Sequence, residues 1–253
     1  MDATDFAAAL PRLQSLLGLA AFCAIAWGFS EARDRFPWRM ALGAVGVQIA
    51  LAALFLYAPG TRDALAALNV VIETLQVASE AGTTLVFGHL GGGPAPFTVT
   101  DEGALFNLAF RGLPLVIFMS ALAALLWHLG VLRLMIGALA AGLERAFGVG
   151  GAVALAASAN VLLGQTEAPL LIRAYLNKLT RSEFFVVLAG GLATVAGTVM
   201  VLYALILAPV VPAALGHILL ASIISAPAAI LMARIIVPPD ADETPTPTAA
   251  GSD

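Results

Sequence analysis

The sequence predicts an all-α polytopic membrane protein with about five transmembrane helices, interfacial helices and one re-entrant helical hairpin. Hydrophobic residues make up 60% of its 253 residues and charged residues only 11%, which leaves too little polar surface for a soluble globule. Apolar segments long enough to cross a bilayer recur along the chain. One stretch, Asn160 to Ala204, is interrupted by polar and small residues in the manner of a transporter binding site.

The charges, the cysteine and the histidines exclude several classes of function. The net charge of -4 is distributed over short connections and the two ends, so no nucleic-acid partner is expected. Cys23 is the single cysteine and forms neither a disulfide framework nor a cysteine metal cluster within the chain. His89, His128 and His217 lie in separate segments, and no nucleophile with a neighbouring base is found. We therefore expect no enzyme, no cofactor and no metal cluster.

The N-terminal region predicts two membrane-spanning helices. Leu13 to Phe29 and Met40 to Tyr57 are each close to the roughly 20 apolar residues that cross about 30 Å of hydrocarbon. Basic residues favour the cytoplasmic side of a membrane, and the link between the two segments carries Arg33, Arg35 and Arg39. The N-terminus is therefore expected outside.

An amphipathic helix and an irregular loop follow. Apolar residues recur on one helical face over about four turns: Leu65, Leu68, Ile72 and Leu75. Such a helix lies in the outer interface or against a partner subunit, and the pattern does not separate the two. The Gly-Gly-Gly-Pro-Ala-Pro run between Gly88 and Pro96 indicates a connection without regular structure.

A third span and an inner interfacial helix come next. The third span is predicted from Leu113 to Leu132, with Pro114 tolerated in the first helical turn, where its missing amide has no partner to lose. Met135 to Phe147 is shorter and ends in charged residues followed by glycines, which predicts an interfacial helix.

The next two apolar pieces predict a re-entrant hairpin. Ala152 to Leu163 and Ala168 to Leu179 would each be about 18 Å long as helices, too short to cross the bilayer alone. Positive residues flank the pair, with Arg145 before it and Lys178 after it, so both ends are expected on one side. The turn at Gly164 to Pro169 then lies near mid-membrane. The alternative is one long tilted span, which would put Arg145 and Lys178 on opposite sides.

The last part of the chain predicts an interrupted span, a further span and a tail. Thr180 to Glu183 reads Thr-x-x-Glu before an apolar run, the capping-box pattern that begins a helix. That helix is predicted from Phe184 to about Leu207, and the small residues in its first half favour local unwinding and close approach of another backbone. Leu215 to Val237 crosses back, and the polar, Pro-rich residues after it indicate a disordered cytoplasmic tail.

These elements predict a multi-pass protein of the cell (inner) membrane, with the N-terminus outside and the C-terminus cytoplasmic. The lipid bilayer is thus one partner. The predicted parts are a first transmembrane hairpin at residues 1–58, an interfacial helix and loop at 59–112, a third span and inner interfacial helix at 113–149, a re-entrant hairpin at 150–180, a broken fourth span followed by a fifth span at 181–237, and a disordered cytoplasmic tail at 238–253.

Three adjacent polar residues at the hairpin turn are candidates for binding a ligand. Glu167 is the one carboxylate in the central apolar stretch, where an unpaired charge is costly. Gln165 offers an amide and Thr166 a hydroxyl, so the set suits a flat polar ligand such as a nucleobase. The alternative is structural: Thr166 caps the second half-helix and Glu167 complements its positive N-terminus.

Backbone carbonyls at helix interruptions can also bind a small cation. Asn160 and Leu163 flank the first interruption, and Thr194 and Val195 lie in the small-residue stretch of the next helix. These four residues are candidates for an ion site. The plainer role of Asn160 is a hydrogen bond between helices.

The segment GQTEAPLL at Gly164 to Leu171, followed by TRSEFF and GGLATVAGTVM, closely resembles the concentrative nucleoside transporter family. The resemblance covers the N-terminal half of that fold, and so implies half of an inverted-repeat transporter fold. It implies a secondary transporter, a symporter that takes up nucleosides with sodium or protons. It also implies a homotrimer in which the hairpin domain moves against a trimeric scaffold.

The resemblance also implies residue roles. Gln165, Thr166 and Glu167 would contact the nucleobase, and Val199 would pack near the base. The coupling sodium ion would be held by the side chains of Asn160 and Thr194 and the carbonyls of Leu163, Thr194 and Val195. Leu202 replaces the glycine usual before Tyr-Ala, a change expected to affect packing rather than the ligand. Sodium versus proton coupling and purine versus pyrimidine preference stay open.

The family's second repeat, with another hairpin and the residues that grip the ribose, has no counterpart in this sequence. The chain alone is therefore expected to bind nucleoside weakly and to transport poorly or not at all. Three explanations are expected to account for this: a fragment or truncated product, one chain of a split transporter whose second repeat lies on a separate chain, or a half that pairs with itself. The alternative from a different class is a membrane assembly partner without transport activity.

Overall fold

The computed structural model describes residues 3–34, 36–57, 60–100, 105–207, 210–211 and 214–239, and all its regular elements in these ranges are helices. Four helical segments are long and apolar enough to cross a membrane: Trp38–Tyr57, Leu108–His128, Arg181–Leu207 and Ala214–Ile236. The predicted class, an all-α polytopic membrane protein, is confirmed. Most of the predicted tail, residues 240–253, lies outside the described residues.

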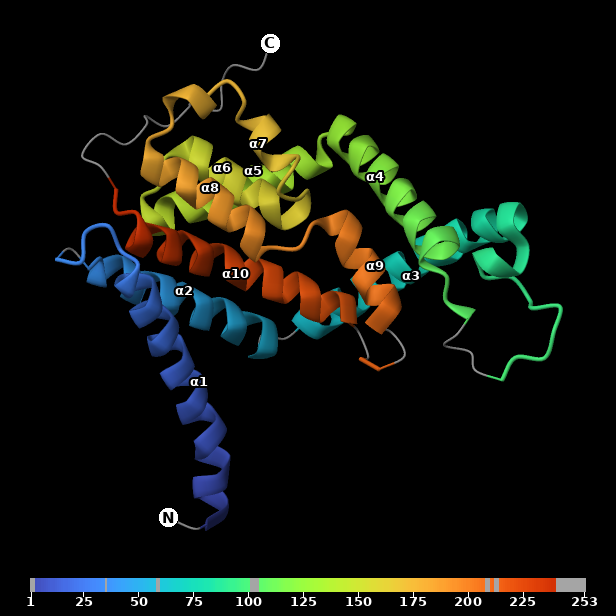
Figure 1. Cartoon of the computed structure of the whole chain (residues 1–253), viewed down its shortest axis with the longest axis horizontal. Helices are drawn as coiled ribbons and strands as arrows, with labels where there is room; N and C mark the ends of the chain where they lie inside the picture. Colours follow the sequence, from blue (N-terminus) through green and yellow to red (C-terminus); the bar gives the residue numbers. More distant parts are fainter. Residues whose placement is uncertain are drawn as a thin grey trace.

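Helices α1 (Ala3–Gly28) and α2 (Trp38–Tyr57) form the N-terminal pair. The N-terminal part of α1 extends away from the other helices (Figure 1), whereas Cys23 and Ala26 pack in one cluster with Leu231 of α10. Large apolar side chains such as Phe22 and Leu42 are exposed, as lipid-facing residues of a span would be.

The link between α1 and α2 lies at the same end of the molecule as the start of α8 (Arg181–Ala193) and the end of α10 (Ala214–Ile236). The backbone amide of Glu31 donates to the Ile236 carbonyl (3.0 Å), and the Glu31 carboxylate pairs with Arg181 (2.6 Å). Arg35, one of the three basic residues predicted in this link, lies outside the described residues.

Helix α3 (Thr61–Phe87) is longer than the roughly four turns predicted, because its second half continues to Phe87 before Gly88 adopts a positive φ of 57°. The side chains of Leu65, Leu68 and Ile72, which define most of the predicted apolar face, lie outside the described ones.

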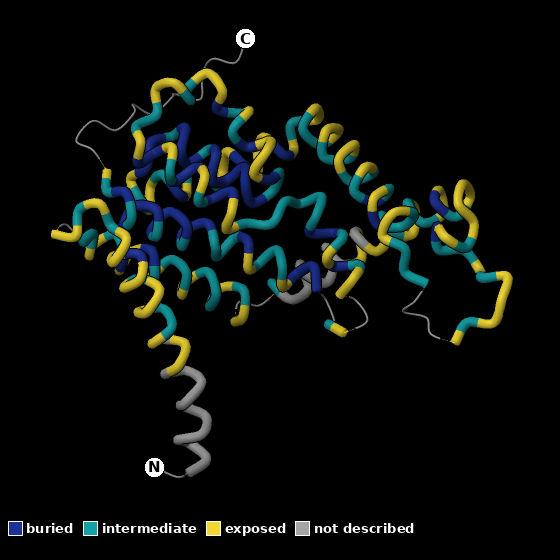
Figure 2. Tube along the Cα trace, viewed as in Figure 1, coloured by how far each residue is buried: buried dark blue, intermediate teal, exposed yellow. Residues whose placement is uncertain are grey.

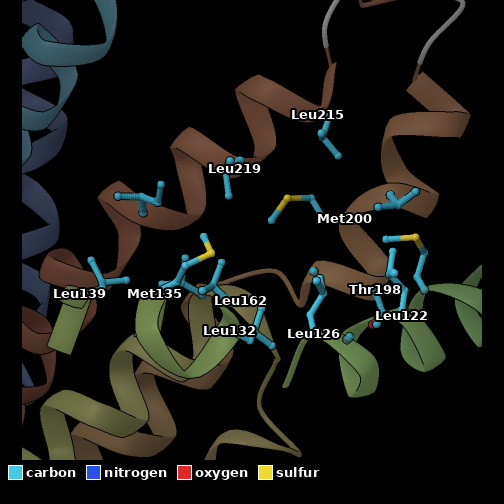
Figure 3. A pocket seen from close by; sticks show the side chains of 16 residues that line it. Leu122, Leu126, Leu132, Met135, Leu139, Leu162, Thr198, Met200, Leu215 and Leu219 are labelled. Atoms are coloured by element: carbon cyan, nitrogen blue, oxygen red, sulfur yellow. The ribbon is translucent and has the colours of Figure 1, made fainter. Parts of the chain in front are cut away.

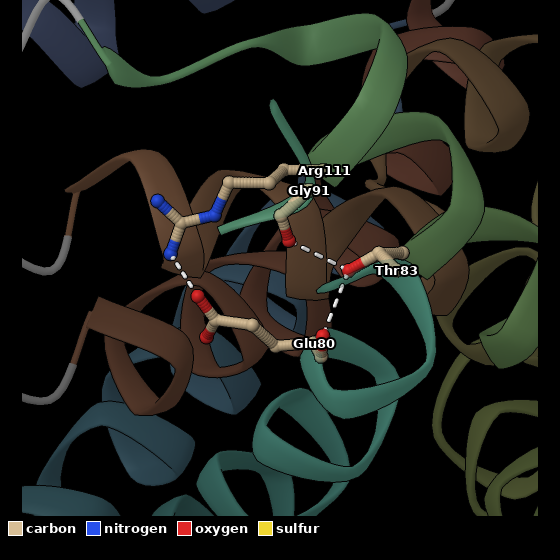
Figure 4. A network of polar contacts seen from close by, with 4 residues as sticks. All are labelled: Glu80, Thr83, Gly91 and Arg111. Carbon is tan, nitrogen blue, oxygen red and sulfur yellow. Dashed lines mark hydrogen bonds and ion pairs between the residues drawn. The ribbon is translucent and has the colours of Figure 1, made fainter. Parts of the chain in front are cut away.

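The glycine-rich connection folds back on α3. Thr83 Oγ1 lies 2.8 Å from the Gly91 carbonyl, and Arg111 pairs with Glu80 across 2.7 Å (Figure 4). A Cβ at Gly91 would lie only 2.2 Å from the Thr83 carbonyl oxygen, so this contact requires glycine. The half-buried ion pair joins α3 to the residues that precede α4.

The third span ends earlier than predicted. A π-helical turn, Leu108–Gly112, leads into α4 (Leu113–His128), with Pro114 in the first turn as expected. Gly130 then adopts a left-handed φ of 80°, and α5 (Val131–Phe147) begins at once. The predicted boundary at Leu132 is wrong because this glycine ends the helix although apolar residues continue on both sides.

Helices α6 (Gly151–Leu162), α8 and α10 form the interior of the molecule (Figures 1 and 2). Val153 of α6, Val186 of α8 and Ile230 of α10 are fully buried in one cluster. Alanines fill most of the remaining buried positions of α6, which lets the neighbouring helices approach closely.

The chain turns back after α6, but the second arm of the hairpin is not the twelve-residue helix that was predicted. Only α7 (Ala168–Leu171) is α-helical, and a 3-10 turn, Leu176–Lys178, follows. Hydrogen bonds between residues three apart, such as Arg173 N to the Leu170 carbonyl, tighten this arm. Ile172 nevertheless packs in the same buried cluster as Val153, so the second arm lies beside the first.

The predicted start and interruption of the fourth span are both present. Thr180 Oγ1 accepts from the Glu183 amide (3.3 Å), and Glu183 Oε2 accepts from the Thr180 amide (2.8 Å), so the capping box is confirmed. Helix α8 ends at Ala193, and α9 (Gly197–Leu207) begins after a three-residue break in which Thr194 is extended.

We predict that Thr180→Ala destabilises the protein by about 1 kcal/mol, because the Glu183 amide then loses its acceptor. Thermal unfolding in detergent measures the effect. Thr74→Ala is the matched control, since the Thr74 hydroxyl is exposed and bonds back to the Val70 carbonyl within α3. Equal melting temperatures for the Thr180 variant and wild type would show that the capping box does not stabilise α8.

Candidate functional site

The hairpin turn is shaped by a glycine in contact with the second interruption. Gly164 has a φ of 124°, a conformation that residues with a side chain rarely adopt. A Cβ at this position would lie 2.6 Å from the Ala196 Cβ, in the break between α8 and α9. The turn therefore needs glycine both for its backbone angle and for its contact with the break.

Gln165, Thr166 and Glu167 follow this glycine and are all exposed. Their side chains form no hydrogen bond with any described residue, and the N-terminus of α7 receives no side-chain cap from Glu167. The purely structural alternative, in which Thr166 caps the half-helix, thus has no hydrogen bond to support it. Within the described structure the amide, hydroxyl and carboxylate are available to a ligand.

The Cα and Cβ atoms of Gln165 pack closely against α8. A Cβ at Gly191 of α8 would lie 2.8 Å from the Gln165 Cβ, so the absence of a side chain at Gly191 lets the turn rest on the helix. The small residues of α8, predicted to favour close approach, thus position the first of the three polar residues.

Asn160 connects α6 to both interruptions and is completely buried. In one orientation of its amide, Nδ2 donates to the Val187 carbonyl (3.3 Å). In the opposite orientation, which satisfies both ends of the amide, Nδ2 donates to the Gly164 carbonyl (3.1 Å) and Oδ1 accepts from the Gly191 amide (3.0 Å). The second arrangement joins the hairpin turn to α8, which agrees with the interhelical role predicted from sequence.

The break between α8 and α9 lies against the end of α6. Thr194 Oγ1 is 3.1 Å from the Asn160 carbonyl and 2.9 Å from the Gly190 carbonyl. A Cβ at Gly197 would lie 2.5 Å from the Leu162 carbonyl oxygen. The structure therefore brings the segment Asn160–Leu163 against Thr194 and Val195, the two other candidate ion ligands.

Ser222 of α10 is a residue of this region that the sequence analysis missed. Its side chain is buried, and its Oγ accepts from the Val195 amide (2.8 Å). A single serine in an apolar span gives no sequence signal beyond its polarity. An interrupted helix leaves backbone groups that need a hydrogen-bond partner from another segment. A polar residue in a nearby apolar span is a candidate for that partner, and this is the signal that could have found Ser222.

The two remaining positions singled out from sequence lie on α9. Val199 is half-buried in the first turn of this helix. Leu202 lies beside the residues before α4, since a Cβ at Gly112 would be 2.9 Å from Leu202 Cδ1. The leucine therefore packs against a glycine of the π-helical turn, and the expectation that it affects packing rather than the ligand stays a prediction.

A cavity of about 400 Å³ lies between α4, α5, α6, α9 and α10 (Figure 3). Leucine and methionine side chains dominate its lining, among them Leu126, Met135, Leu162, Met200 and Leu219, and Thr198 is its polar side chain. Gln165, Thr166 and Glu167 do not line it. A polar ligand would leave its hydrogen-bonding groups unpaired there, so this cavity is not the candidate site.

The described residues contain no group of three His, Cys, Asp or Glu side chains placed to hold a metal ion. The polar groups at the two interruptions are amides, hydroxyls, backbone carbonyls and one carboxylate, that of Glu167. These are ligands for a hard monovalent cation or hydrogen-bonding partners for a neutral ligand.

Two family models match the chain. Residues 17–90 match the model described as the Na+ dependent nucleoside transporter N-terminus, and residues 109–210 match the Gate model, described as nucleoside recognition. The second match contains both interruptions and all of the candidate site residues.

The chain is also similar to individual proteins. It is 35% identical over 227 residues to the nucleoside permease NupC of Helicobacter pylori, covering 89% of this chain and 52% of that protein. An uncharacterized transporter of Haemophilus influenzae is likewise 35% identical over 226 residues, or 89% of this chain and 51% of the relative. The chain thus spans about half the length of these relatives.

A solved structure of CNTnw in an inward-facing substrate-bound state has the same fold over this region. The TM-score is 0.80 at 35% sequence identity, with 94% of this chain and 56% of the other covered. These similarities do not favour the alternative of a non-transporting assembly partner.

We predict that Gly164→Ala destabilises the protein by roughly 1–3 kcal/mol, because alanine is strained at this φ and its methyl group meets Ala196. Thermal unfolding of the purified protein measures the change. The control is Gly142→Ala in α5, where a methyl group meets no neighbouring atom and replaces a helical glycine. A melting temperature of Gly164→Ala at or above that of the control would contradict the packing described for the turn.

Proposed function

We propose a function from one premise: the chain belongs to the concentrative nucleoside transporter family, and it matches the N-terminal half of that family. This is a family of transporters and not of enzymes. In our proposal the protein serves ion-coupled uptake of nucleosides across the cell membrane. This chain contributes the hairpin that contacts the nucleobase and the residues that bind the coupling ion.

The observation that carries the nucleobase part is a set of polar side chains at the hairpin turn that form no hydrogen bond with a described residue. Gln165, Thr166 and Glu167 supply donors and acceptors, and Gly164 and Gly191 hold the turn against α8. A nucleobase has a flat polar edge that needs several such partners at once. Val199 of α9 would supply an apolar surface for the base.

The coupling ion in this proposal is sodium. Asn160 and Thr194 would offer side-chain oxygens, and Leu163, Thr194 and Val195 their backbone carbonyls, at the two interruptions that lie against each other. The side chains of these four residues do not titrate near neutral pH, which favours a cation over a proton as their ligand. The match to a sodium-dependent family model supports the same choice.

The remaining contacts of the nucleoside would come from outside the matched half. The chain spans about half the length of its relatives, so we assign the ribose contacts to a second repeat, which a longer chain or a separate chain would supply. We also propose the homotrimer that the family resemblance implies.

The proposed orientation places the N-terminus outside and the C-terminus in the cytoplasm. It is supported by the basic residues at one end of the molecule, where Arg33 of the α1–α2 link and Arg181 of α8 lie near the end of α10. The re-entrant course of the hairpin follows if Arg145 and Lys178 emerge on this same side.

We predict that Glu167→Gln weakens uridine binding by about 10- to 100-fold, because the charged acceptor of the nucleobase is lost while the shape is kept. Equilibrium binding of labelled uridine to the purified protein in nanodiscs, at fixed sodium, measures the effect. Glu73→Gln is the control, since Glu73 is an exposed carboxylate on α3. An affinity unchanged by Glu167→Gln would remove this residue from the site.

We also predict that cysteines at positions 145 and 178 are both labelled from the cytoplasmic face. The variants Arg145→Cys and Lys178→Cys are made in a Cys23→Ala background, because Cys23 is the single native cysteine. A membrane-impermeant maleimide is applied to vesicles of each orientation, with Phe97→Cys as the position expected outside. Labelling of 145 and 178 from opposite faces would replace the hairpin by a tilted span.

A further inference from the structure

The Val195 peptide groups lie against one buried hydroxyl from another helix. Ser222 is in the middle of α10 and only 2% exposed. Its Oγ accepts from the Val195 amide at 2.8 Å and lies 3.5 Å from the Val195 carbonyl oxygen. Both contacts fall in the break between α8 and α9, where a helical acceptor for the amide is missing.

The hydrogen bond to the amide also orients the preceding carbonyl. The peptide bond between Thr194 and Val195 is planar and trans, so the Thr194 carbonyl points opposite to the Val195 amide. Because the amide points to Ser222, the Thr194 carbonyl is directed away from α10. The Thr194 hydroxyl lies 3.1 Å from the Asn160 carbonyl of α6 and 2.9 Å from the Gly190 carbonyl of α8, so its one hydrogen is shared between them. The bond to Ser222 and the contacts of this hydroxyl together restrict rotation of the peptide.

The second contact is weak enough to be replaced. At 3.5 Å the Ser222 hydroxyl is at the limit of a hydrogen bond to the Val195 carbonyl. A cation can therefore coordinate the Val195 carbonyl oxygen while the shorter hydrogen bond from the Val195 amide to Ser222 stays in place.

We propose that Ser222 is a positioning residue for the coupling-ion site. Its hydroxyl fixes the Thr194–Val195 peptide so that the Thr194 carbonyl faces the ion and the Val195 carbonyl stays available to it. Ser222 itself is not an ion ligand in this assignment. The proposal rests on the proposed function, because it concerns the ion site assigned there.

The test compares Ser222→Ala with wild type by sodium titration of the purified protein, using the thermal shift produced by sodium chloride over choline chloride. We expect Ser222→Ala to raise the half-saturating sodium concentration about tenfold, because the freed peptide no longer presents its carbonyl. Uridine affinity at saturating sodium should change by no more than about twofold, since the nucleobase contacts are untouched. Ser222→Thr, which keeps the hydroxyl, should restore the wild-type titration.

The control is Ser225→Ala, one turn further along α10. Ser225 is half-buried, and its hydroxyl has no hydrogen bond to a described residue, so its sodium titration should match wild type. If Ser222→Ala does not fold, Ser222→Cys replaces it, and its weaker acceptor should still raise the half-saturating concentration. A titration equal to wild type in a folded Ser222→Ala or Ser222→Cys would overturn the role of Ser222. A wild-type protein unresponsive to sodium would overturn the proposed sodium coupling, and this proposal with it.

Discussion

The structure depends on the rule that a backbone group within a membrane protein needs a hydrogen-bonding partner, since hydrocarbon supplies none. In the described part of the chain, one helix is interrupted after Leu162 and another after Ala193. The interruptions are placed against each other and against α10, so groups from neighbouring helices satisfy them. The hydrogen bond between the Thr194 hydroxyl and the Asn160 carbonyl is one contact between the two segments. A single interruption without such neighbours would leave amides and carbonyls unpaired.

Close approach of the two interruptions requires residues without side chains, and the chain has them where the contacts are tightest. Gly164 meets Ala196, Gly191 meets Gln165, and Gly197 meets the Leu162 carbonyl. Each glycine lies on one interrupted segment and faces the other. The glycines that lower the cost of unwinding therefore also let the unwound segments pack closely. Close helix packing and a role in a binding site are compatible explanations for these residues.

The features that sequence predicted well are those decided within a few residues. Thr180 and Glu183 form their capping box from a four-residue pattern, and the glycines after Ala189 predicted the break. The features that it missed depend on distant contacts or on one residue. Ser222 has a role only because α10 passes Val195, and Gly130 ends α4 within an apolar run that offers no other boundary. The second hairpin arm was predicted as a helix because its composition is apolar, whereas its hydrogen bonds follow the tighter 3-10 pattern.

Coupling between the binding of an ion and the binding of a nucleoside requires a residue whose position depends on both ligands. Asn160 is the candidate, because it contacts both interruptions. Its carbonyl lies 3.1 Å from the Thr194 hydroxyl, next to the proposed ion site. Its side-chain amide, in the orientation that satisfies both ends, bonds to the Gly164 carbonyl and the Gly191 amide beside the polar turn. An ion bound at the break would restrict Asn160 and Thr194 together. In the proposed function, an ion that favours this arrangement of Asn160 and Thr194 would also favour the arrangement of the turn that presents the polar side chains, and so would raise the affinity for the nucleoside. Because linkage is reciprocal, a bound nucleoside would tighten the ion by the same factor.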